Sequence, residues 1–287
     1  MAPLPGTLHG KRVLVLRAEG QGEALELLLR ERGAESVLLP ILAFRPPQDP
    51  APLEHALSPE VLATYDWVLF TSANGVHFTV RALAALRMGQ NASPSSAADA
   101  LRACRIAVIG PGTSNALAEH GLEPALSAST FRGEGLSEAL LRDGATIATE
   151  ARKGESPRAL LLRAQKAREV VPETLRSHGW VVDVVAAYES FAPEGVASEV
   201  ARVLEAGAVD AVVLTSASTV THLHDLLGAR TARLLGSVKV ASIGPITTEA
   251  AEKLGVRVDG TAQAYTMGGL VDVLESHVFA AGLADER

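Results

Sequence analysis

Residues 69–76 read LFTSANGV, and residues 213–220 read VLTSASTV. In both stretches a Thr-Ser-Ala tripeptide follows an apolar run and precedes a segment with the residue spacing of a helix. The two copies begin 144 residues apart, which is about half of the 287-residue chain. This spacing raises the hypothesis that the chain contains one structural unit twice.

Four further pairs of segments match in the same order along the two halves of the chain. Arg17 aligns with Arg163 in the first of these pairs, and Gly33 aligns with Gly179. Five ordered matches indicate an internal duplication rather than a chance likeness of one tripeptide. The four pairs are 12–34 with 158–180, 42–46 with 189–193, 105–124 with 239–258, and 131–141 with 265–275.

Each half reads as alternating strands and helices. The run RVLVL at 12–16 is almost wholly apolar, which is typical of a strand buried on both faces of a sheet. The stretch 23–33 has the apolar spacing of a helix and ends at Gly33, a residue suited to the left-handed position that closes a helix. This alternation predicts an α/β protein with parallel sheets covered by helices. The small polar stretches 89–100 and 148–157 are predicted to be loops.

Turns between strands and helices carry hydroxyl side chains. Ser72 follows the run VLFT and Thr113 follows AVIGPG, so each is predicted to cap a helix, and Gly121 is predicted to end the second helix. Ser216 and Thr247 hold the matching positions in the other half. Ligands of open α/β sheets bind beyond the carboxyl ends of the strands, where these four turns are predicted to lie.

The four turns combine free backbone N–H groups at helix starts with hydroxyl groups, which suits carboxylate or phosphate ligands. The alternative for Ser72, Thr113, Ser216 and Thr247 is a helix cap without a ligand. Four such turns in one duplicated chain favour a ligand-binding cleft between two domains.

The composition limits the class of protein. Hydrophobic residues make up 47% and charged residues 21%, a globular balance, while aromatic residues make up 4%, so the cores should consist mainly of Ala, Leu and Val. Apolar runs are no longer than strands, and the N-terminus lacks the apolar stretch of a signal peptide, which together predict a cytoplasmic protein that does not span a membrane. The net charge of −7 disfavours nucleic-acid binding. The single Cys104 can form no internal disulfide and is predicted to fill a core position.

Motifs of nucleotide and metal chemistry are weak or missing. The segment 110–115 begins like a dinucleotide-binding GxGxxG motif but ends in Asn115, and it does not follow the first strand. The sequence has no Walker A lysine, no HExxH, no GxSxG and no clustered set of metal ligands. The pattern therefore predicts chemistry that uses neither a metal nor a nucleotide cofactor.

At the level of these motifs the chain resembles the uroporphyrinogen-III synthase family. Each motif is short, but their order and spacing together are specific and cover nearly the whole chain. The segments that carry the resemblance are VLVLR at 13–17, FTSANGV at 70–76, AVIGPGTSNALAEHGL at 107–122, AAYESFAP at 186–193, VLTSAST at 213–219 and SIGPITTEAAEKLGV at 242–256.

The resemblance implies two flavodoxin-like domains with parallel sheets, joined by two extended linkers, with an active-site cleft between the domains. It also implies a crossed chain path, in which strand 12–16 shares a sheet with 211–215 and not with 67–71. The implied domains are 1–42 with 194–287, and 48–187, with linkers at about 43–47 and 188–193. A monomer is expected.

The implied activity is that of a cyclising hydro-lyase of haem biosynthesis. Hydroxymethylbilane, a linear tetrapyrrole with eight carboxylates, loses water and closes to uroporphyrinogen III with inversion of ring D, through azafulvene and spiro intermediates. No cofactor is implied. The bilane also closes without an enzyme to isomer I, so the protein must bind a preferred fold of the bilane and stabilise the transition state that leads to the spiro species.

The resemblance also assigns roles to residues. Tyr188 matches a family tyrosine that faces the cleft and assists departure of the hydroxyl, since a neutral phenol can donate a hydrogen bond to a leaving oxygen; the alternative is packing in the linker. Thr113 and Thr247 match family threonines, and Ser72 and Ser216 match family serines. Ser114 replaces a small apolar residue of the family pattern.

Two arginines complete the predicted substrate-binding set. Arg17 and Arg163 each follow the first strand of a half, and each is predicted either to contact a substrate carboxylate or to form an ion pair with a neighbouring helix. After Arg17 the sequence AEGQGE replaces the proline that often follows the family arginine. This departure weakens the resemblance at that turn.

Two other function classes use the same turns. The first is a non-catalytic two-domain protein that binds or senses a small ligand, and the second is a nucleotide-sugar transferase, for which the sequence offers no clear diphosphate-binding signature. Supplying hydroxymethylbilane and identifying the product isomer separates the enzyme from both alternatives.

Overall fold

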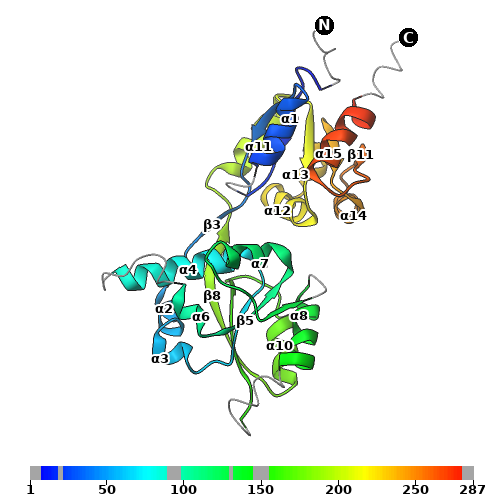
Figure 1. Ribbon diagram of the computed structural model, residues 1–287. Helices are drawn as coiled ribbons and strands as arrows, with labels where there is room; N and C mark the ends of the chain where they lie inside the picture. The colour runs from blue at the N-terminus through cyan, green and yellow to red at the C-terminus, as the bar shows by residue number, and fades with distance from the viewer. Residues whose placement is uncertain (1–7, 19–21, 89–97, 129–131, 145–154, 280–287) are drawn as a thin grey trace, which may run out of the picture. The chain divides into compact units, whose positions relative to one another are not determined.

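The computed structural model describes residues 8–18, 22–88, 98–128, 132–144 and 155–279. The chain divides into two compact units, which we call unit 1 and unit 2 (Figure 1). Unit 1 comprises Met1–Ala43 and Phe191–Arg287, and unit 2 comprises Phe44–Ser190. Each unit contains one sheet, and each sheet joins strands from both halves of the sequence.

The sheet of unit 1 has five strands in the order β11-β10-β9-β1-β2, and every neighbouring pair is parallel. Val13 of β1 stands opposite Ala211 of β9, so the first strand lies beside a strand almost 200 residues later in the chain. The prediction that strand 12–16 shares a sheet with 211–215 is therefore confirmed. The strands are β1 (Arg12–Val15), β2 (Glu35–Leu38), β9 (Ala211–Leu214), β10 (Lys239–Ser242) and β11 (Gly260–Thr261).

Helices cover both faces of this sheet because successive strand residues alternate between two cores. Leu14 belongs to one buried cluster with residues of α11, α12 and α14, whereas Val13 and Val15 belong to a second cluster with residues of α1 and α15. The helices are α1 (Glu23–Glu31), α11 (Val196–Glu205), α12 (Ala217–Leu227), α13 (Arg230–Leu235), α14 (Pro245–Lys253) and α15 (Met267–Val273), followed by a π-helical turn (Leu274–Val278).

The sheet of unit 2 has the strand order β3-β8-β7-β4-β5-β6. The four neighbouring pairs from β8 to β6 are parallel, so their carboxyl ends lie at one edge of the sheet. The strands are β3 (Ala43–Arg45), β4 (Trp67–Phe70), β5 (Arg105–Ile109), β6 (Leu126–Ala128), β7 (Arg158–Ala164) and β8 (Val181–Phe191). The predicted linker 188–193 thus belongs largely to strand β8, and 43–45 to strand β3.

The helices of unit 2 also divide between two faces. Val68 and Phe70 pack with residues of α4 and α7, while Trp67 and Leu69 pack with residues of α8 and α10, and Figure 1 shows these two helix pairs on different sides of the strands. The helices are α2 (Ala51–Ala56), α3 (Pro59–Leu62), α4 (Ala73–Met88), α6 (Asp99–Arg102), α7 (Gly110–Ala118), α8 (Gly133–Ala139) and α10 (Val170–Ser177), with a π-helical turn (Leu140–Gly144) after α8.

The two sheets have equivalent strand orders once the repeat is taken into account. β11, β10, β9, β1 and β2 of unit 1 correspond to β6, β5, β4, β7 and β8 of unit 2. Each sheet therefore combines two strands from the start of one half with three strands from the rest of the other half, and the sheet of unit 2 has β3 as an additional edge strand. The predicted α/β class, the duplication and the crossed chain path are confirmed.

Several local predictions can be compared with the structure. Gly33 and Gly121 have φ of +83° and +65°, the left-handed values predicted for residues that end helices. The predicted loop 89–100 lies partly outside the described residues, and the end of it forms helix α6 from Asp99. Most of the predicted loop 148–157 also lies outside them. Cys104 is half-buried and packs against the core of unit 2 that contains residues of α4 and α7.

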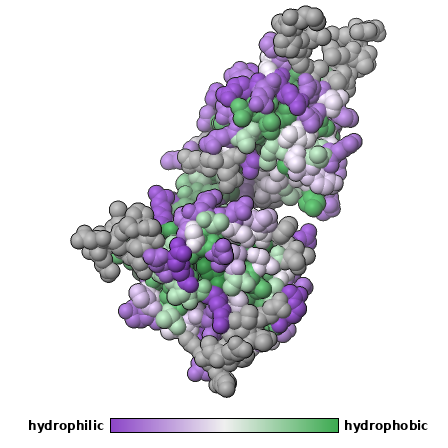
Figure 2. All heavy atoms as spheres, viewed as in Figure 1, coloured by the Kyte–Doolittle hydropathy of each residue, from purple (hydrophilic) through white to green (hydrophobic). Residues whose placement is uncertain are grey.

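The surface carries both hydrophilic and apolar side chains, as the globular composition predicts. On the face that Figure 2 shows, hydrophilic side chains are interspersed with apolar ones over both units. Among the helices described, none has both the length and the apolar character needed to cross a membrane.

Candidate active site

The carboxyl edge of the unit 2 sheet carries the residue with the strongest catalytic prediction. Tyr188 lies in β8 opposite Ala164 of β7, and its ring packs between two phenylalanines. The ring centroid of Phe44 lies 5.6 Å away at an interplanar angle of 79°, and that of Phe78 lies 5.5 Å away at 20°. Tyr188 is only 7% exposed, so the aromatic contacts fix the ring and leave the hydroxyl as its polar end.

The Tyr188 hydroxyl meets a predicted site residue. It lies 3.0 Å from the Oγ atom of Ser72, which follows strand β4. Burial raises the pKa of Tyr188, and the hydrogen bond with Ser72 opposes this shift to a smaller extent. The phenol therefore stays neutral at physiological pH and keeps a proton to donate.

Ser72 has two roles in this geometry. Its Oγ accepts a hydrogen bond of 3.2 Å from the backbone N–H of Gly75, which confirms the prediction that Ser72 caps a helix, here α4. The same oxygen contacts Tyr188. Gly75 itself is closely packed, because a Cβ at this position would lie 3.1 Å from the carbonyl oxygen of Leu162. Close packing of the turn against β7 thus holds Ser72 beside β8.

Glu189 is a buried residue of this site that sequence reasoning missed. Its carboxylate accepts a hydrogen bond of 2.8 Å from the backbone N–H of Gln48 and one of 3.2 Å from the Nε of Arg45. The backbone hydrogen bond from Gln48, helped by Arg45, lowers the pKa of Glu189. The ionised carboxylate ties the segment after β3 to β8 directly beside Tyr188. An acidic residue directly after a predicted catalytic tyrosine was the available signal in AAYESFAP.

The predicted capping role of Thr113 is wrong, and Thr247 is no cap either. Helix α7 begins at Gly110 and α14 begins at Pro245, with Ile109 and Gly244 at the N-cap positions and no side-chain cap in either helix. A proline in the first turn of each helix favours this earlier start, since its fixed φ suits the first helical positions. Both threonines therefore lie inside the first turns of their helices, and each is 4% exposed.

In unit 1, Ser216 caps α12 by accepting a hydrogen bond of 3.1 Å from the backbone N–H of Thr219, as predicted. Arg17 follows β1 and donates a 3.7 Å hydrogen bond to the sulfur of Met267. Partial burial of Arg17 lowers its pKa by removing water from the charged group. Within the part of the chain that the structure describes, no carboxylate forms an ion pair with Arg17, so the predicted ion pair is not found there.

Arg163 differs from Arg17 because its charge is already paired. It is 5% exposed, donates a 2.7 Å hydrogen bond to the carbonyl oxygen of Arg168, and forms an ion pair with Glu169. Glu169 is the N-cap residue of α10, so the predicted ion pair with a neighbouring helix is confirmed for Arg163. Its predicted contact with substrate stays a prediction.

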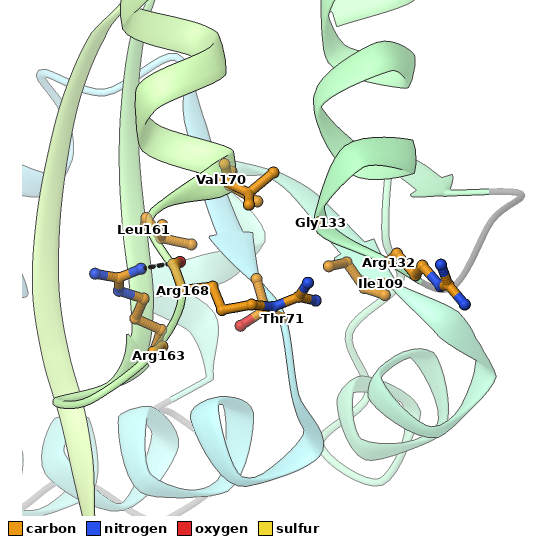
Figure 3. Close-up of a pocket in the computed structure, with 10 residues that line it drawn as sticks. Thr71, Ile109, Arg132, Gly133, Leu161, Arg163, Arg168 and Val170 are labelled. Atoms are coloured by element: carbon orange, nitrogen blue, oxygen red, sulfur yellow. Dashed lines mark hydrogen bonds between the residues drawn. The ribbon is translucent and has the colours of Figure 1, made fainter. Parts of the chain in front are cut away.

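A pocket of about 220 Å³ opens at the same edge of unit 2 (Figure 3). Its walls come from the ends of β4, β5 and β7 and from the starts of α8 and α10. Sequence reasoning predicted Arg163 but missed Arg132 and Arg168, because both stand where the two halves of the chain differ. The residues that matter for its chemistry are Thr71, Arg132, Gly133, Arg163, Arg168 and Val170.

The residues that the structure describes contain no group of three or more His, Cys, Asp or Glu side chains arranged to hold a metal ion. The polar groups at the two carboxyl edges include hydroxyls, guanidinium groups and backbone N–H groups at helix starts, and the carboxylates of Glu169 and Glu189 are paired with arginines. The hydroxyls, guanidinium groups and N–H groups bind carboxylates and donate protons or hydrogen bonds. The fold and these edges define a duplicated two-unit α/β protein suited to an anionic organic ligand.

Comparison with known proteins identifies the family. The family model of uroporphyrinogen-III synthase HemD matches residues 23–272. A uroporphyrinogen-III synthase from Synechococcus elongatus is 31% identical over 274 residues, which cover 93% of this chain and 96% of that protein. The chain belongs to the uroporphyrinogen-III synthase family and is a hydro-lyase of tetrapyrrole biosynthesis.

Solved structures agree at the level of the fold. A mutant uroporphyrinogen III synthase from the extremely thermophilic bacterium Thermus thermophilus has a TM-score of 0.60 and 21% identity, and the match covers 95% of this chain and 99% of that one. A uroporphyrinogen-III synthetase from Helicobacter pylori has a TM-score of 0.52 and 16% identity, with coverage of 95% and 99%. At these identities the likeness confirms the α/β fold with two parallel sheets.

Proposed function

We propose that this protein converts hydroxymethylbilane into uroporphyrinogen III, with loss of water and inversion of ring D. The observation that carries the proposal is the family match over residues 23–272, together with the full-length relative at 31% identity. The substrate carries eight carboxylates, and helix-start N–H groups can bind carboxylates without adding net positive charge to a chain whose own charge is −7.

The Ser72–Tyr188 pair assists departure of the hydroxyl group in this proposal. A serine hydroxyl has one proton and accepts two hydrogen bonds. When Gly75 N–H and the Tyr188 phenol fill the two acceptor positions, the proton of Ser72 is free to reach the leaving oxygen. Ser72 is also more exposed than Tyr188. Tyr188 thus acts as a hydrogen-bond donor or acid through Ser72, and Ser72 touches the substrate.

The proposed step balances without a cofactor. The bond between the methylene carbon and the hydroxyl oxygen breaks, the leaving oxygen takes a proton and departs as water, and the pyrrole nitrogen loses its own proton. The product is the neutral azafulvene. Because one proton is gained and one is lost, the phenol of Tyr188 recovers its proton within the cycle.

Further contacts with the substrate are assigned to the predicted binding residues. We assign carboxylate binding to the turns that contain Thr113, Ser216 and Thr247, and to Arg17, whose guanidinium donates to the weak sulfur acceptor of Met267. Arg163 contributes by holding the loop that follows β7. The protein acts as a monomer in this proposal, which sedimentation of the purified chain tests.

The function is tested by supplying hydroxymethylbilane and separating the product isomers by chromatography. The expected product is uroporphyrinogen III, in excess over the isomer I that forms without enzyme. Isomer I alone would refute the proposal. A chain that binds the bilane tightly yet yields only isomer I would instead be a non-catalytic binding or sensor protein.

A further inference from the structure

We propose that the pocket of unit 2 between the starts of α8 and α10 binds one carboxylate side chain of the substrate, with the Arg168 guanidinium as its main contact. The proposal rests on the proposed function, because the substrate named there supplies the carboxylate. It adds a binding residue, Arg168, that lies outside the Thr-Ser-Ala and Gly-Pro turns.

The size of the pocket fits a side chain rather than a whole ligand. Its volume is about 220 Å³, below the range of roughly 300–1,000 Å³ typical of pockets that enclose a complete small molecule. Thr71, at the end of β4, brings a hydroxyl to the pocket, and Val170 and Val171 bring the first two N–H groups of α10. These groups are hydrogen-bond donors of the kind that a carboxylate accepts from.

Arg168 supplies a positive charge that contributes little to the stability of the fold. Its guanidinium lies 3.9 Å from the carboxylate of Glu134, and the two side chains are 73% and 51% exposed. Such an exposed and long ion pair contributes little to stability. Figure 3 shows the Arg168 side chain reaching across the pocket in the direction of Thr71. A guanidinium can hold a carboxylate through two parallel hydrogen bonds, so a ligand carboxylate can displace Glu134.

Arg163 prepares the pocket for an anion as a positioning residue. Glu169 stands at the N-cap of α10, where its negative charge would repel a carboxylate, and Arg163 neutralises it by the ion pair. Arg163 also donates to the carbonyl oxygen of Arg168, which fixes the backbone that carries the Arg168 side chain (Figure 3). The Nε atom of Arg163 is buried without a hydrogen-bond partner among the described residues. With Glu169 engaged in this way, the start of α10 has no side-chain cap.

The duplicated unit shows that the fold does not require these arginines. In unit 1 the position of Arg168 is taken by Gly22 and that of Arg132 by Thr266, which caps α15 through the N–H of Gly269. The position of Gly133 is taken by Met267, whose sulfur accepts the hydrogen bond from Arg17.

A different hollow lies beside Arg17 in unit 1, against the end of β2. It measures about 150 Å³ and is lined mostly by apolar residues, with Arg17 as its one charged side chain among the lining residues. At the positions that match Arg132 and Arg168, unit 1 thus carries no charged side chain. A functional cause explains this difference better than a structural one.

The experiment measures uroporphyrinogen III formation at a series of hydroxymethylbilane concentrations, so that kcat and KM are obtained separately. The variants are Arg168→Gln, Arg168→Lys and the control Arg102→Gln. Arg102 is a suitable control because it is 54% exposed in unit 2, pairs with Asp99 at 2.9 Å, and lies in α6 before β5, at the opposite edge of the sheet. Circular dichroism and the thermal unfolding midpoint check that each variant folds.

Arg168→Gln is expected to raise KM about tenfold and to change kcat by less than about twofold, since a hydrogen bond to a charged group is lost in both ground and transition states. Arg168→Lys should fall between Gln and wild type, and the control should match wild type. Added salt should raise the KM of the wild type more than that of Arg168→Gln.

The outcomes separate the two proposals. An active wild type with an unchanged KM in Arg168→Gln overturns the pocket proposal alone. An equal rise of KM in Arg168→Gln and Arg102→Gln also overturns it, because loss of any surface arginine would then suffice. A wild-type protein that forms no uroporphyrinogen III overturns the proposed function, and with it the pocket proposal.

Discussion

Ser72 of unit 2 and Ser216 of unit 1 stand at the same point of the same turn, and each caps the helix that follows by accepting a backbone hydrogen bond. Their other partners differ. Ser72 meets the phenol of Tyr188, while Ser216 meets the hydroxyls of Ser218 and Thr219 on its own helix. The cap therefore belongs to the duplicated scaffold, and the contact with a phenol distinguishes Ser72 from Ser216.

The position that holds Tyr188 in unit 2 holds Ile41 in unit 1, when the repeats are aligned through 42–46 and 189–193. Ile41 is 2% exposed and packs in the apolar core on the α11 and α12 side of its sheet. A buried tyrosine has to place its hydroxyl beside a polar partner, whereas isoleucine needs only apolar contacts. At this position unit 1 thus has an apolar side chain and no hydroxyl that could donate a proton.

The arginines that follow β1 and β7 extend the contrast. Arg163 is buried in contacts with Glu169 and Arg168, and Arg17 is half-buried against Met267. One arginine is thus part of the internal structure of a loop, and the other donates to a weak acceptor, the Met267 sulfur. The comparison teaches that equivalent positions in the two units cannot be assumed to have equivalent roles, so each prediction below sets a residue of unit 2 against a control.

The largest expected effect concerns Tyr188. Tyr188→Phe removes one oxygen and keeps the ring between Phe44 and Phe78, so it should fold normally. Uroporphyrinogen III formation should fall by about 10²–10⁴, the usual contribution of general-acid assistance. Isomer I should then appear as unprocessed bilane closes on its own, and chromatography measures both products.

Tyr188→Ala separates chemistry from packing. If the hydroxyl carries the function, the Phe and Ala variants lose activity to a similar degree. If Tyr188 serves packing alone, the Phe variant keeps full activity while the Ala variant loses stability, because a large buried side chain is deleted. That second pattern would remove Tyr188 from the catalytic proposal.

A matched pair of serine variants tests the contrast between the turns directly. Ser72→Ala and Ser216→Ala each delete one helix cap, so each should lower the free energy of unfolding by about 1 kcal/mol. Ser72→Ala should also lower kcat by at least about tenfold, since the path from Tyr188 to the leaving oxygen is lost. Denaturant unfolding and steady-state kinetics measure the two effects. Equal losses of kcat in both variants would contradict the proposal that Ser72, unlike Ser216, takes part in the reaction.

Thr113→Val and Thr247→Val test whether the buried threonines bind substrate. Neither hydroxyl caps its helix, so valine, which has nearly the same shape, should cost less than about 1 kcal/mol in stability. At least one variant should lose several-fold in activity at a temperature where it stays folded. Small and equal activity losses in both variants would assign the two threonines to structure alone.

The sequence predicted the fold better than it predicted the site. Apolar runs and helical spacing gave the alternation of strands and helices, because those periodicities are local. They do not say which strands pair, so the neighbours of Arg12–Val15 came from the family resemblance and were then confirmed by pairing with β9. Thr113 was misjudged as a cap because the proline in the first turn of α7 allows the helix to begin earlier.

From the repeat alone, candidate site residues were predicted where the two halves agree and missed where they differ, while Tyr188, whose counterpart is Ile41, came from the family resemblance. Matching serines, threonines and arginines drew attention to Ser72 and Arg163, whereas Arg168 has glycine as its counterpart and produced no match. The contact between Ser72 and Tyr188 joins residues 116 positions apart, and no local pattern reports it. Positions where aligned repeats differ can therefore indicate functional residues, and a search that looks only for identical residues in the two repeats misses them.

The smallest expected effect is a pH dependence confined to unit 2. Burial, helped by a hydrogen bond to Asp183, raises the pKa of Tyr65 to about 12, and burial also raises the pKa of Tyr188. The folded state therefore holds these phenol protons more tightly than the unfolded state, whose tyrosines titrate near pH 10. The stabilising contribution is complete below about pH 10 and is lost as the pH rises towards about 12.

Tryptophan fluorescence can follow this loss, because both tryptophans of the chain, Trp67 and Trp180, are buried in unit 2. Denaturant midpoints measured by fluorescence should fall between about pH 10 and pH 12, and the fall should be smaller in Tyr65→Phe, which has no phenol proton to lose at that position. Tyr265→Phe in unit 1 is the control, since Tyr265 is 67% exposed. If Tyr65→Phe and Tyr265→Phe show the same slope as the wild type, the alkaline loss has another source, and Tyr65 does not set its pH dependence.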